Sequence, residues 1–232
     1  VVNQGGKADP IAMEWSNYLF ARGGDFHDDN WNGLLTSNNA LEALKDYVSM
    51  VNNYGPLGAE SFGFDEAFNV AAQGNAYSYL TYNFFLNSYN DPEQSAVVGK
   101  MELIPVPGEG GLNGAWGWSI PKSSPNAEAA WEFLKWVESP DIAKRRAALG
   151  GAPTRKDVFN DPDLNEQFDH YPLLKDLLAT AKNFPLFTYT PQFVEVMGTE
   201  LSKAVIGEQD PAVALKIMND ELEALAAKDG KR

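Results

Sequence analysis

The sequence predicts an α/β protein in which helices outnumber a few short strands. Over most of the chain, apolar residues recur at spacings of three and four, which is the helical period, whereas in three short segments they alternate as in strands. Aspartate–proline pairs also precede several helical patterns, and this pair suits the cap and first position of a helix. With 232 residues, the chain is long enough for one large domain or two small ones.

The N-terminal third is expected to form three amphipathic helices with clear start and stop signals. Their expected starts are Asp9-Pro10, Ser37 and Asp65, and their expected ends are Gly23-Gly24, Gly55-Pro56 and Gly74. The apolar residues expected on their buried faces are Ile11, Trp15, Tyr18, Leu19, Leu41, Leu44, Val48, Val51, Ala67, Phe68, Ala71 and Ala72.

The middle of the chain changes to the period of a strand. Residues 76–80, 101–106 and 116–120 alternate as strands do. Ser124 and Pro125 then suit the cap and first position of a helix over residues 127–138.

Helical patterns fill the remainder of the chain. Asp161-Pro162 and Asp210-Pro211 again provide helix starts. The apolar positions of the three long C-terminal patterns are Leu174, Leu177, Leu178 and Ala181, then Phe193, Val196, Met197, Leu201 and Ala204, then Ala214, Ile217, Met218, Leu222 and Leu225.

Composition excludes several classes of function. The formal net charge of -14, from 32 acidic and 18 basic residues, disfavours binding to nucleic acid or to anionic membranes. The absence of cysteine excludes disulfides, a thiol nucleophile and zinc–thiolate sites. No apolar run reaches the roughly 20 residues that span a bilayer. The first residues resemble no signal peptide and include no initiator Met, so we expect that an upstream segment exists or was removed.

The most informative segment is 111–126, where glycines surround Trp116 and a helical pattern follows. Glycines let the backbone approach a ligand, and an exposed indole can stack on the apolar face of a sugar ring. The segment resembles the C-terminal half of family 1 extracellular solute-binding proteins, the sugar receptors of bacterial ABC importers. Four further stretches fit the same family in the same order: residues 64–75, 91–100, 150–155 and 198–203.

The resemblance implies a type II periplasmic-binding-protein-like fold, in which the chain crosses between two lobes three times. The glycine cluster 108–114 matches the second crossing, and the third is expected just after Arg155. Residues 1–113 and 159–232 would then form the C-terminal lobe, with 114–158 as the crossing and a segment of the N-terminal lobe. Most of the N-terminal lobe is expected upstream, which makes the chain a fragment or a truncation.

Trp116 is the first candidate for contact with ligand, and a buried core or hinge tryptophan is the alternative. Gly114 would let the backbone approach the ligand there. Trp118, two residues further along the expected strand, is interpreted as a core residue. The aromatic residues Trp131, Phe133 and Trp136 are also interpreted as core packing. In a fragment, the apolar surface of their helix is expected to be left exposed as an unusual patch or to be covered by another chain.

Further candidates follow the strand expected at 76–80, because ligands bind beyond the carboxyl ends of strands in α/β sheets. Thr81, Tyr82 and Asn83 would hydrogen-bond sugar hydroxyls, and Phe84 or Tyr82 would supply a second stacking face. The alternative is a strand end packed with core aromatics. Related proteins often carry Asp or Trp in this segment, and neither occurs here.

Arg155 has a fork of donors that could bridge two vicinal hydroxyls, or it could anchor a loop to the C-terminus of a helix. Tyr189 and Gln192 are weaker candidates, since some relatives present an aromatic residue at this place. The acidic loop 23–31 lacks the spacing of a calcium loop, and His170, the only other histidine besides His27, offers no zinc spacing. The loop is therefore expected to be solvated and to hold no metal.

The resemblance implies a receptor without enzymatic activity or cofactor. Its partners would be a sugar or polyol and the transmembrane permease of an ABC importer, and it would work in the bacterial envelope, periplasmic or tethered to the cell surface. The two lobes would close around the sugar by a hinge motion. The sequence contains no motif of a hydrolase elbow, phosphate loop or metalloprotease. A carbohydrate-active hydrolase remains the alternative, because acidic residues are numerous enough to supply a catalytic pair.

Overall fold

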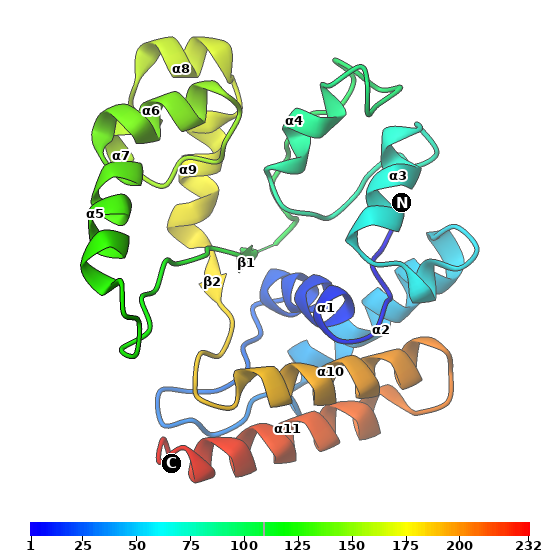
Figure 1. The fold of residues 1–232 in the computed structure, drawn as a ribbon. Helices are drawn as coiled ribbons and strands as arrows, with labels where there is room; N and C mark the ends of the chain where they lie inside the picture. Colours follow the sequence, from blue (N-terminus) through cyan, green and yellow to red (C-terminus); the bar gives the residue numbers. More distant parts are fainter. Residues whose placement is uncertain (109) are drawn as a thin grey trace.

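Four long helices enclose the largest hydrophobic core. The structure is a computed structural model and describes residues 1–108 and 110–232. In it, α1 (Asp9–Ala21), α2 (Asn38–Tyr54), α10 (Thr190–Val205) and α11 (Pro211–Lys228) pack against one another (Figure 1). Trp15 and Phe193 are completely buried, and each meets the Phe26 ring edge-on, at centroid distances of 6.2 and 6.1 Å. These helices, predicted from their apolar spacing, are confirmed.

A second, smaller core lies apart from the first (Figure 1). It is formed by α6 (Pro140–Ala148), α7 (Lys156–Phe159), α8 (Pro162–Gln167) and α9 (Tyr171–Thr180). At its centre the Tyr171 hydroxyl donates to the carbonyl oxygen of Ala147 at 3.2 Å. The lobe boundary expected after residue 158 therefore does not separate two cores, because the helices on both sides of it share this one.

A third cluster is formed by α3 (Phe64–Ala72), α4 (Phe85–Tyr89) and the N-terminal segment, with the short 3₁₀ helix η1 (Ala59–Ser61) beside it. Phe68 stacks on Phe85 and Tyr89 at centroid distances of 5.2 and 4.9 Å. Val2 forms a parallel bridge with Tyr79, so the start of the chain is tied to the segment that precedes α4.

Two short parallel strands connect the first and second cores (Figure 1). β1 (Leu112–Asn113) pairs with β2 (Lys182–Asn183), with Leu112 opposite Lys182. The Leu112 N–H donates to Asn17 Oδ1 on α1 at 2.8 Å, and Lys182 Nζ donates to the carbonyl oxygen of Gly24 at 3.0 Å. The chain thus leaves the four-helix core along β1 and returns to it along β2.

The α/β class is confirmed, but the strands lie elsewhere than predicted. In the described residues, the segments 76–80, 101–106 and 116–120 form no strand, and only Tyr79 makes a bridge. A strand needs a neighbouring backbone along its length, and these extended segments have no such neighbour in the described part of the chain.

The predicted helix starts are mostly confirmed. Ser37, Asp161 and Asp210 cap their helices by accepting backbone N–H groups. Two predictions were wrong. Asp9 is the first residue of α1 rather than its cap, and Asn126, not Ser124, occupies the cap position of α5 (Ala127–Val137), without a side-chain hydrogen bond.

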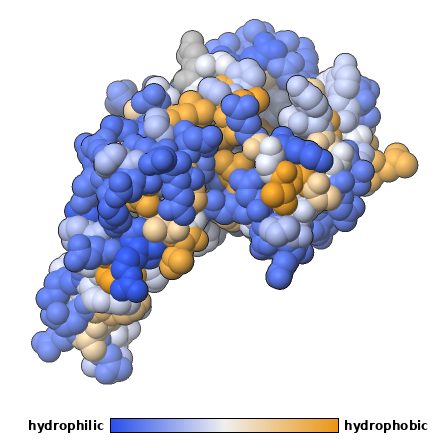
Figure 2. Space-filling view, turned by 90° about the horizontal axis from the view of Figure 1, so that it is seen from above, coloured by the Kyte–Doolittle hydropathy of each residue, from blue (hydrophilic) through white to orange (hydrophobic). Residues whose placement is uncertain are grey.

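Helix α5 exposes aromatic residues. Only Val137 of this helix is buried, and Trp131, Phe133 and Trp136 each remain about half exposed. The prediction of an apolar patch on this helix in the chain alone is confirmed, whereas the core packing expected for these side chains is not present among the described residues. No helix within residues 1–108 and 110–232 combines the length and apolar composition that a membrane span requires. The face of the molecule seen in Figure 2 is mostly hydrophilic, with hydrophobic residues in separate groups.

Candidate functional site

Gly114, the residue after β1, packs directly on Tyr82. A Cβ atom built on Gly114 would lie 2.3 Å from Cε1 of Tyr82, which is closer than any side chain tolerates. Glycine is therefore required where the backbone passes over this ring. The contact brings together two of the predicted site residues, although they lie 32 positions apart in the sequence.

Tyr82 is part of an aromatic wall, which we define as Phe64, Tyr82 and Phe84. The Phe84 ring is nearly parallel to Tyr82 at a centroid distance of 5.9 Å and an angle of 10°, and Phe64 lies at 5.7 Å. Burial raises the pKa of Tyr82, so its hydroxyl stays neutral and can donate a hydrogen bond at physiological pH. Phe84 is 50% exposed and offers an open ring surface at the edge of the wall.

The two polar candidates in this segment differ. The Thr81 hydroxyl oxygen is buried near the Tyr79 hydroxyl and makes no hydrogen bond of normal geometry with the described residues. Thr81 therefore points toward the interior in this structure. Asn83, between Tyr82 and Phe84 in the sequence, is partly exposed, and its side-chain atoms are not among the buried polar atoms without a partner in the described residues.

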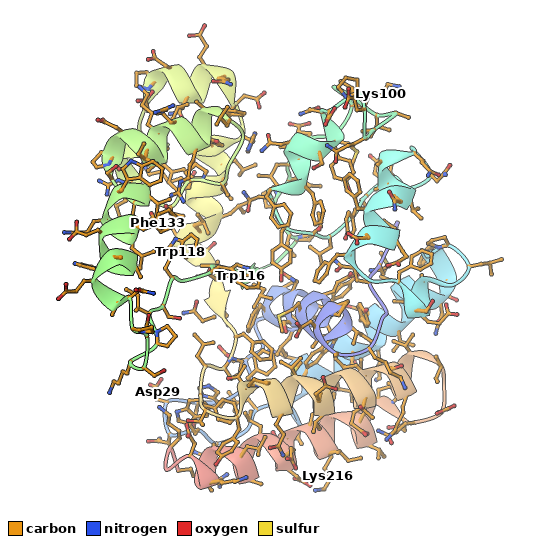
Figure 3. The ribbon with its side chains drawn as sticks, in the orientation of Figure 1. Asp29, Lys100, Trp116, Trp118, Phe133 and Lys216 are labelled. Carbon is orange, nitrogen blue, oxygen red and sulfur yellow. The ribbon has the colours of Figure 1, made fainter. Side chains whose placement is uncertain are left out.

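Trp116 is fully available to a ligand. Its side chain is 96% exposed, and a Cβ on the neighbouring Gly117 would find no atom within 4 Å. Figure 3 places Trp116 near β1, between the parts of the molecule that contain the first and the second core. In the structure, Trp116 is therefore not the core tryptophan that was the alternative interpretation. Its stacking on a sugar stays a prediction.

Trp118 was predicted to be a core residue, and that prediction is wrong in this structure. Its side chain is mostly exposed, because no element of the described chain covers it. The indole Nε1 donates to Glu138 Oε1 at 3.1 Å, and the ring meets Phe133 edge-on at 6.3 Å (Figure 3). Trp118 is thus attached to the end of α5 rather than buried.

Arg155 has the second of its two predicted roles in this structure. Its Nε and Nη2 donate to the two carboxylate oxygens of Asp157, each at 2.9 Å, and its Nη1 donates to the carbonyl oxygen of Glu138 at 3.3 Å. Glu138 is the C-cap of α5. The guanidinium therefore anchors the loop to the C-terminus of a helix, and Asp157 and Glu138 already accept its N–H groups in the absence of ligand.

Tyr189 and Gln192 lie beside the last helix. Lys228 Nζ sits 4.3 Å from the centroid of the Tyr189 ring, and Gln192 Nε2 donates to Glu221 Oε1 on α11 at 3.1 Å. These contacts attach the beginning of α10 to α11. Neither residue is in contact with the aromatic wall through any aromatic pair or hydrogen bond of the described residues.

The acidic loop at 23–31 is held by its own hydrogen bonds. Asp28 accepts the N–H groups of Asn30 and Asn32, each at 2.9 Å, and with the Asn32 amide these bonds lower the pKa of Asp28. His27 stacks on Trp31 at 4.0 Å. Across residues 1–108 and 110–232, no three His, Asp or Glu side chains gather so that they could hold a metal ion.

One residue that organises this region was not singled out from the sequence. Glu138 accepts the Trp118 indole N–H, forms an ion pair with Arg146 at 3.2 Å, and offers its carbonyl oxygen to Arg155. It therefore connects the segment after β1 to α6 and to the loop before α7. A single glutamate at a helix end carries no sequence pattern that reveals such contacts.

Comparison with known proteins identifies a family. Residues 3–144 match the model of the family described as bacterial extracellular solute-binding protein. A curated protein of Sinorhizobium fredii, named as a probable amino-acid ABC transporter periplasmic-binding protein, is 24% identical over 97% of this chain and 52% of its own length.

Solved structures agree with this result. A solute-binding protein from Agrobacterium radiobacter, in complex with ribitol, superposes with a TM-score of 0.85 at 28% identity, over 97% of this chain and 59% of its own. Maltose-bound MalE3 of T. maritima gives a TM-score of 0.85 at 27% identity, over 97% of this chain and 60% of its own. The chain thus spans between half and three fifths of the length of these proteins.

Proposed function

This chain belongs to the family of bacterial extracellular solute-binding proteins, and we propose that it is part of a sugar-binding receptor that delivers an oligosaccharide or polyol to the permease of an ABC transporter. The observation that carries the proposal is the fully exposed Trp116, two residues after Gly114, whose backbone packs on Tyr82 of the aromatic wall. Exposed aromatic rings of this kind suit the apolar faces of sugar rings.

We further propose that the two lobes meet at β1 and β2. Residues 1–108 and 184–232 would belong to the lobe with the four-helix core, and residues 114–180 to the other lobe. The proposal rests on the two separate cores and on the only strand pair that connects them within the described residues. It moves the third crossing from the expected position after Arg155 to β2.

The second lobe would be completed by a part of the receptor outside these 232 residues. Phe133 and Trp136 of α5 form a connected aromatic surface with Trp118, which lies beside the helix, with centroid distances of 6.3 Å for Trp118–Phe133 and 5.8 Å for Phe133–Trp136. An exposed patch of this kind usually marks a contact surface. Because the known relatives are longer than this chain, the remainder of the second lobe is the partner that we propose for it.

Sugar is a better ligand class than amino acid for this site. An amino acid needs a charged partner for its carboxylate and for its ammonium group, and Trp116, Tyr82 and Phe84 provide aromatic surface and one neutral hydroxyl. Arg155, the charged residue predicted for the site, is already paired with Asp157. The ribitol and maltose bound to two similar structures support the same class.

The mechanism follows from these contacts. Stacking on Trp116 would remove the apolar face of the sugar from water, while Tyr82 and Asn83 would satisfy hydroxyl groups. Because β1 and β2 are only two residues long, small backbone rotations there would let the lobes close over the sugar. The permease would recognise the closed form in the periplasm or at the cell surface, and no bond of the sugar would be broken.

A ligand screen tests this proposal. The full-length receptor should melt at a higher temperature with members of one carbohydrate class among polyols and mono-, di- and trisaccharides, and should not respond to amino acids. The bound carbohydrate should be recovered intact after long incubation. Stabilisation by amino acids alone would show that the ligand is an amino acid and not a sugar. Turnover of the carbohydrate that depends on an acidic residue would favour the hydrolase.

A further inference from the structure

The N-terminal segment pairs with the segment that leads into the aromatic wall. The Val2 N–H donates to the carbonyl oxygen of Ser78 at 3.0 Å, and Val2 and Tyr79 form a parallel bridge. In a parallel ladder, the next bond from this side runs from the N–H of Gln4 to the carbonyl oxygen of Leu80. In this structure a different arrangement takes the place of that bond.

Glu14 of α1 accepts a hydrogen bond from the backbone of Gln4. Its Oε2 accepts the Gln4 N–H at 2.6 Å, and its Oε1 accepts from Asn3 Nδ2. The side chain of Gln4 then replaces its backbone in the ladder, because Gln4 Nε2 donates to the carbonyl oxygen of Leu80 at 3.1 Å. Leu80 directly precedes Thr81 and Tyr82, so the start of the candidate site is held by Gln4, and Gln4 is held by Glu14.

The rest of Gln4 is also fixed. The Tyr47 hydroxyl on α2 donates to the Gln4 carbonyl oxygen at 3.1 Å. The following residue is also closely packed, since a Cβ on Gly5 would lie 2.5 Å from the backbone of Glu60. With its main chain held on both sides, the only adjustable contact of Gln4 with the candidate site is its side-chain amide.

Glu14 is buried, and no cationic side chain of the described residues pairs with it. It is 2% exposed, and the titratable groups that face it are the hydroxyls of Tyr18 on α1, Tyr47 on α2 and Tyr79. Burial raises the pKa of Glu14 to about 8, against the smaller opposing effect of its hydrogen bonds. The same burial raises the pKa of each of the three tyrosines, so none of them ionises near pH 8.

The neighbouring side-chain amides offer acceptors for the proton of a neutral Glu14. The oxygen atoms Asn3 Oδ1 and Gln4 Oε1 are buried and lack a hydrogen-bond donor among the described residues, and both belong to residues that contact the Glu14 carboxyl. A protonated carboxyl adds one donor to a network that has an excess of acceptors. Ionisation would remove this donor and place an unpaired charge in the interior.

We propose that Gln4 and Glu14 are positioning residues for the segment 80–83: the neutral carboxyl of Glu14 holds Gln4, and the Gln4 side chain fixes the carbonyl of Leu80 and with it the placement of Tyr82. The role in sugar binding rests on the function proposed above, whereas the positioning itself does not. When Glu14 loses its proton, this segment loosens and the site is no longer ordered for ligand.

The pH dependence of sugar affinity tests the proposal in the full-length receptor. If only the form with neutral Glu14 binds, a pKa of about 8 leaves roughly one tenth of the molecules competent at pH 9, so the apparent affinity should fall about tenfold between pH 6 and pH 9. Glu14→Gln keeps an acceptor and a donor and cannot ionise, so its affinity should be the same at both pH values. Gln4→Met should bind more weakly than wild type at both.

Hydrogen exchange of residues 78–84, measured without ligand, gives a readout independent of sugar binding. At pH 9 this segment should exchange faster in wild type than in Glu14→Gln, and at pH 6 the two should be equal. As a matched control, Asn52→Ala removes another side-chain bond to a backbone carbonyl, from Asn52 Nδ2 to Val205 at 2.9 Å, and should change neither readout at 78–84.

The outcomes separate the two proposals. If wild type binds no sugar at any pH, the proposed function fails, and the exchange measurement still decides the positioning. If wild type and Glu14→Gln exchange equally at pH 9 and bind sugar with the same pH profile, the positioning role is wrong.

Discussion

Replacement of Trp116 by alanine in the full-length receptor should weaken sugar binding with little loss of stability. A tryptophan buries about 150–250 Å² when it is covered, and a sugar stacked on one face covers roughly half of that. At about 25 cal/mol per Å², the lost contact corresponds to about 2–3 kcal/mol, and we expect a measured loss of about 1–3 kcal/mol, or about 5- to 150-fold in Kd.

Stability should hardly change in this variant, because Trp116 is 96% exposed and a surface substitution changes the free energy of unfolding by only about 0.5 kcal/mol. Isothermal titration gives the affinity, and thermal unfolding without sugar gives the stability.

Trp136→Ala is the matched control. It removes a half-exposed tryptophan from the aromatic surface of α5. In the complete receptor this side chain should lie against the remainder of the second lobe, so its loss should lower the unfolding temperature and leave the sugar affinity nearly unchanged. If Trp116→Ala binds sugar normally but unfolds at a much lower temperature, Trp116 is a packing residue and the stacking argument is refuted.

Three further predictions concern stability. Gly114→Ala should destabilise the protein by about 1–3 kcal/mol, because its Cβ would overlap the Tyr82 ring. In the background of Tyr82→Ala, the same change should cost much less. If the losses in unfolding free energy of the two single variants simply add in the double variant, the contact is contradicted. Folding raises the pKa of Glu14 from 4.5 to about 8, so between these pH values the folded state holds a proton that the unfolded state has lost. The free energy of unfolding should therefore fall as the pH rises through this range, by up to about 5 kcal/mol. Urea unfolding of Glu14→Gln should show a flatter pH profile, and a profile parallel to that of wild type would be inconsistent with a buried neutral acid. Asp210→Ala should cost about 1 kcal/mol, because it removes the cap that accepts the N–H of Ala212 at 2.8 Å, and an unchanged denaturation midpoint would show that the cap contributes nothing.

The helices were predictable from the sequence because their signals are local. The caps at Ser37, Asp161 and Asp210 each act within three residues, and the apolar spacing of α10 and α11 directly reflects the face that each helix buries. The strands were not predictable in the same way. Pairing between β1 and β2 joins residues 70 positions apart, and alternation at 76–80 indicates an extended backbone without indicating a partner.

The candidate site was only partly accessible for the same reason. Tyr82, Phe84 and Gly114 could be named from their types and from the family resemblance, but the contact between Gly114 and Tyr82 depends on how two distant segments meet. The pairing of Arg155 with Asp157 is local, yet an arginine offers the same fork to a carboxylate as to a sugar, and the sequence does not distinguish them. The exchange of backbone for side chain at Gln4 depends on α1 and had no sequence signal.

A crystal structure of the full-length receptor with a carbohydrate found in the screen is the most direct test of the central claim. We expect an intact sugar between two lobes connected by β1 and β2, with one face of its ring on the Trp116 indole and with Tyr82 and Phe84 on the opposite side of the ligand. A carbohydrate bound away from these residues, or one found cleaved in the site, would contradict it.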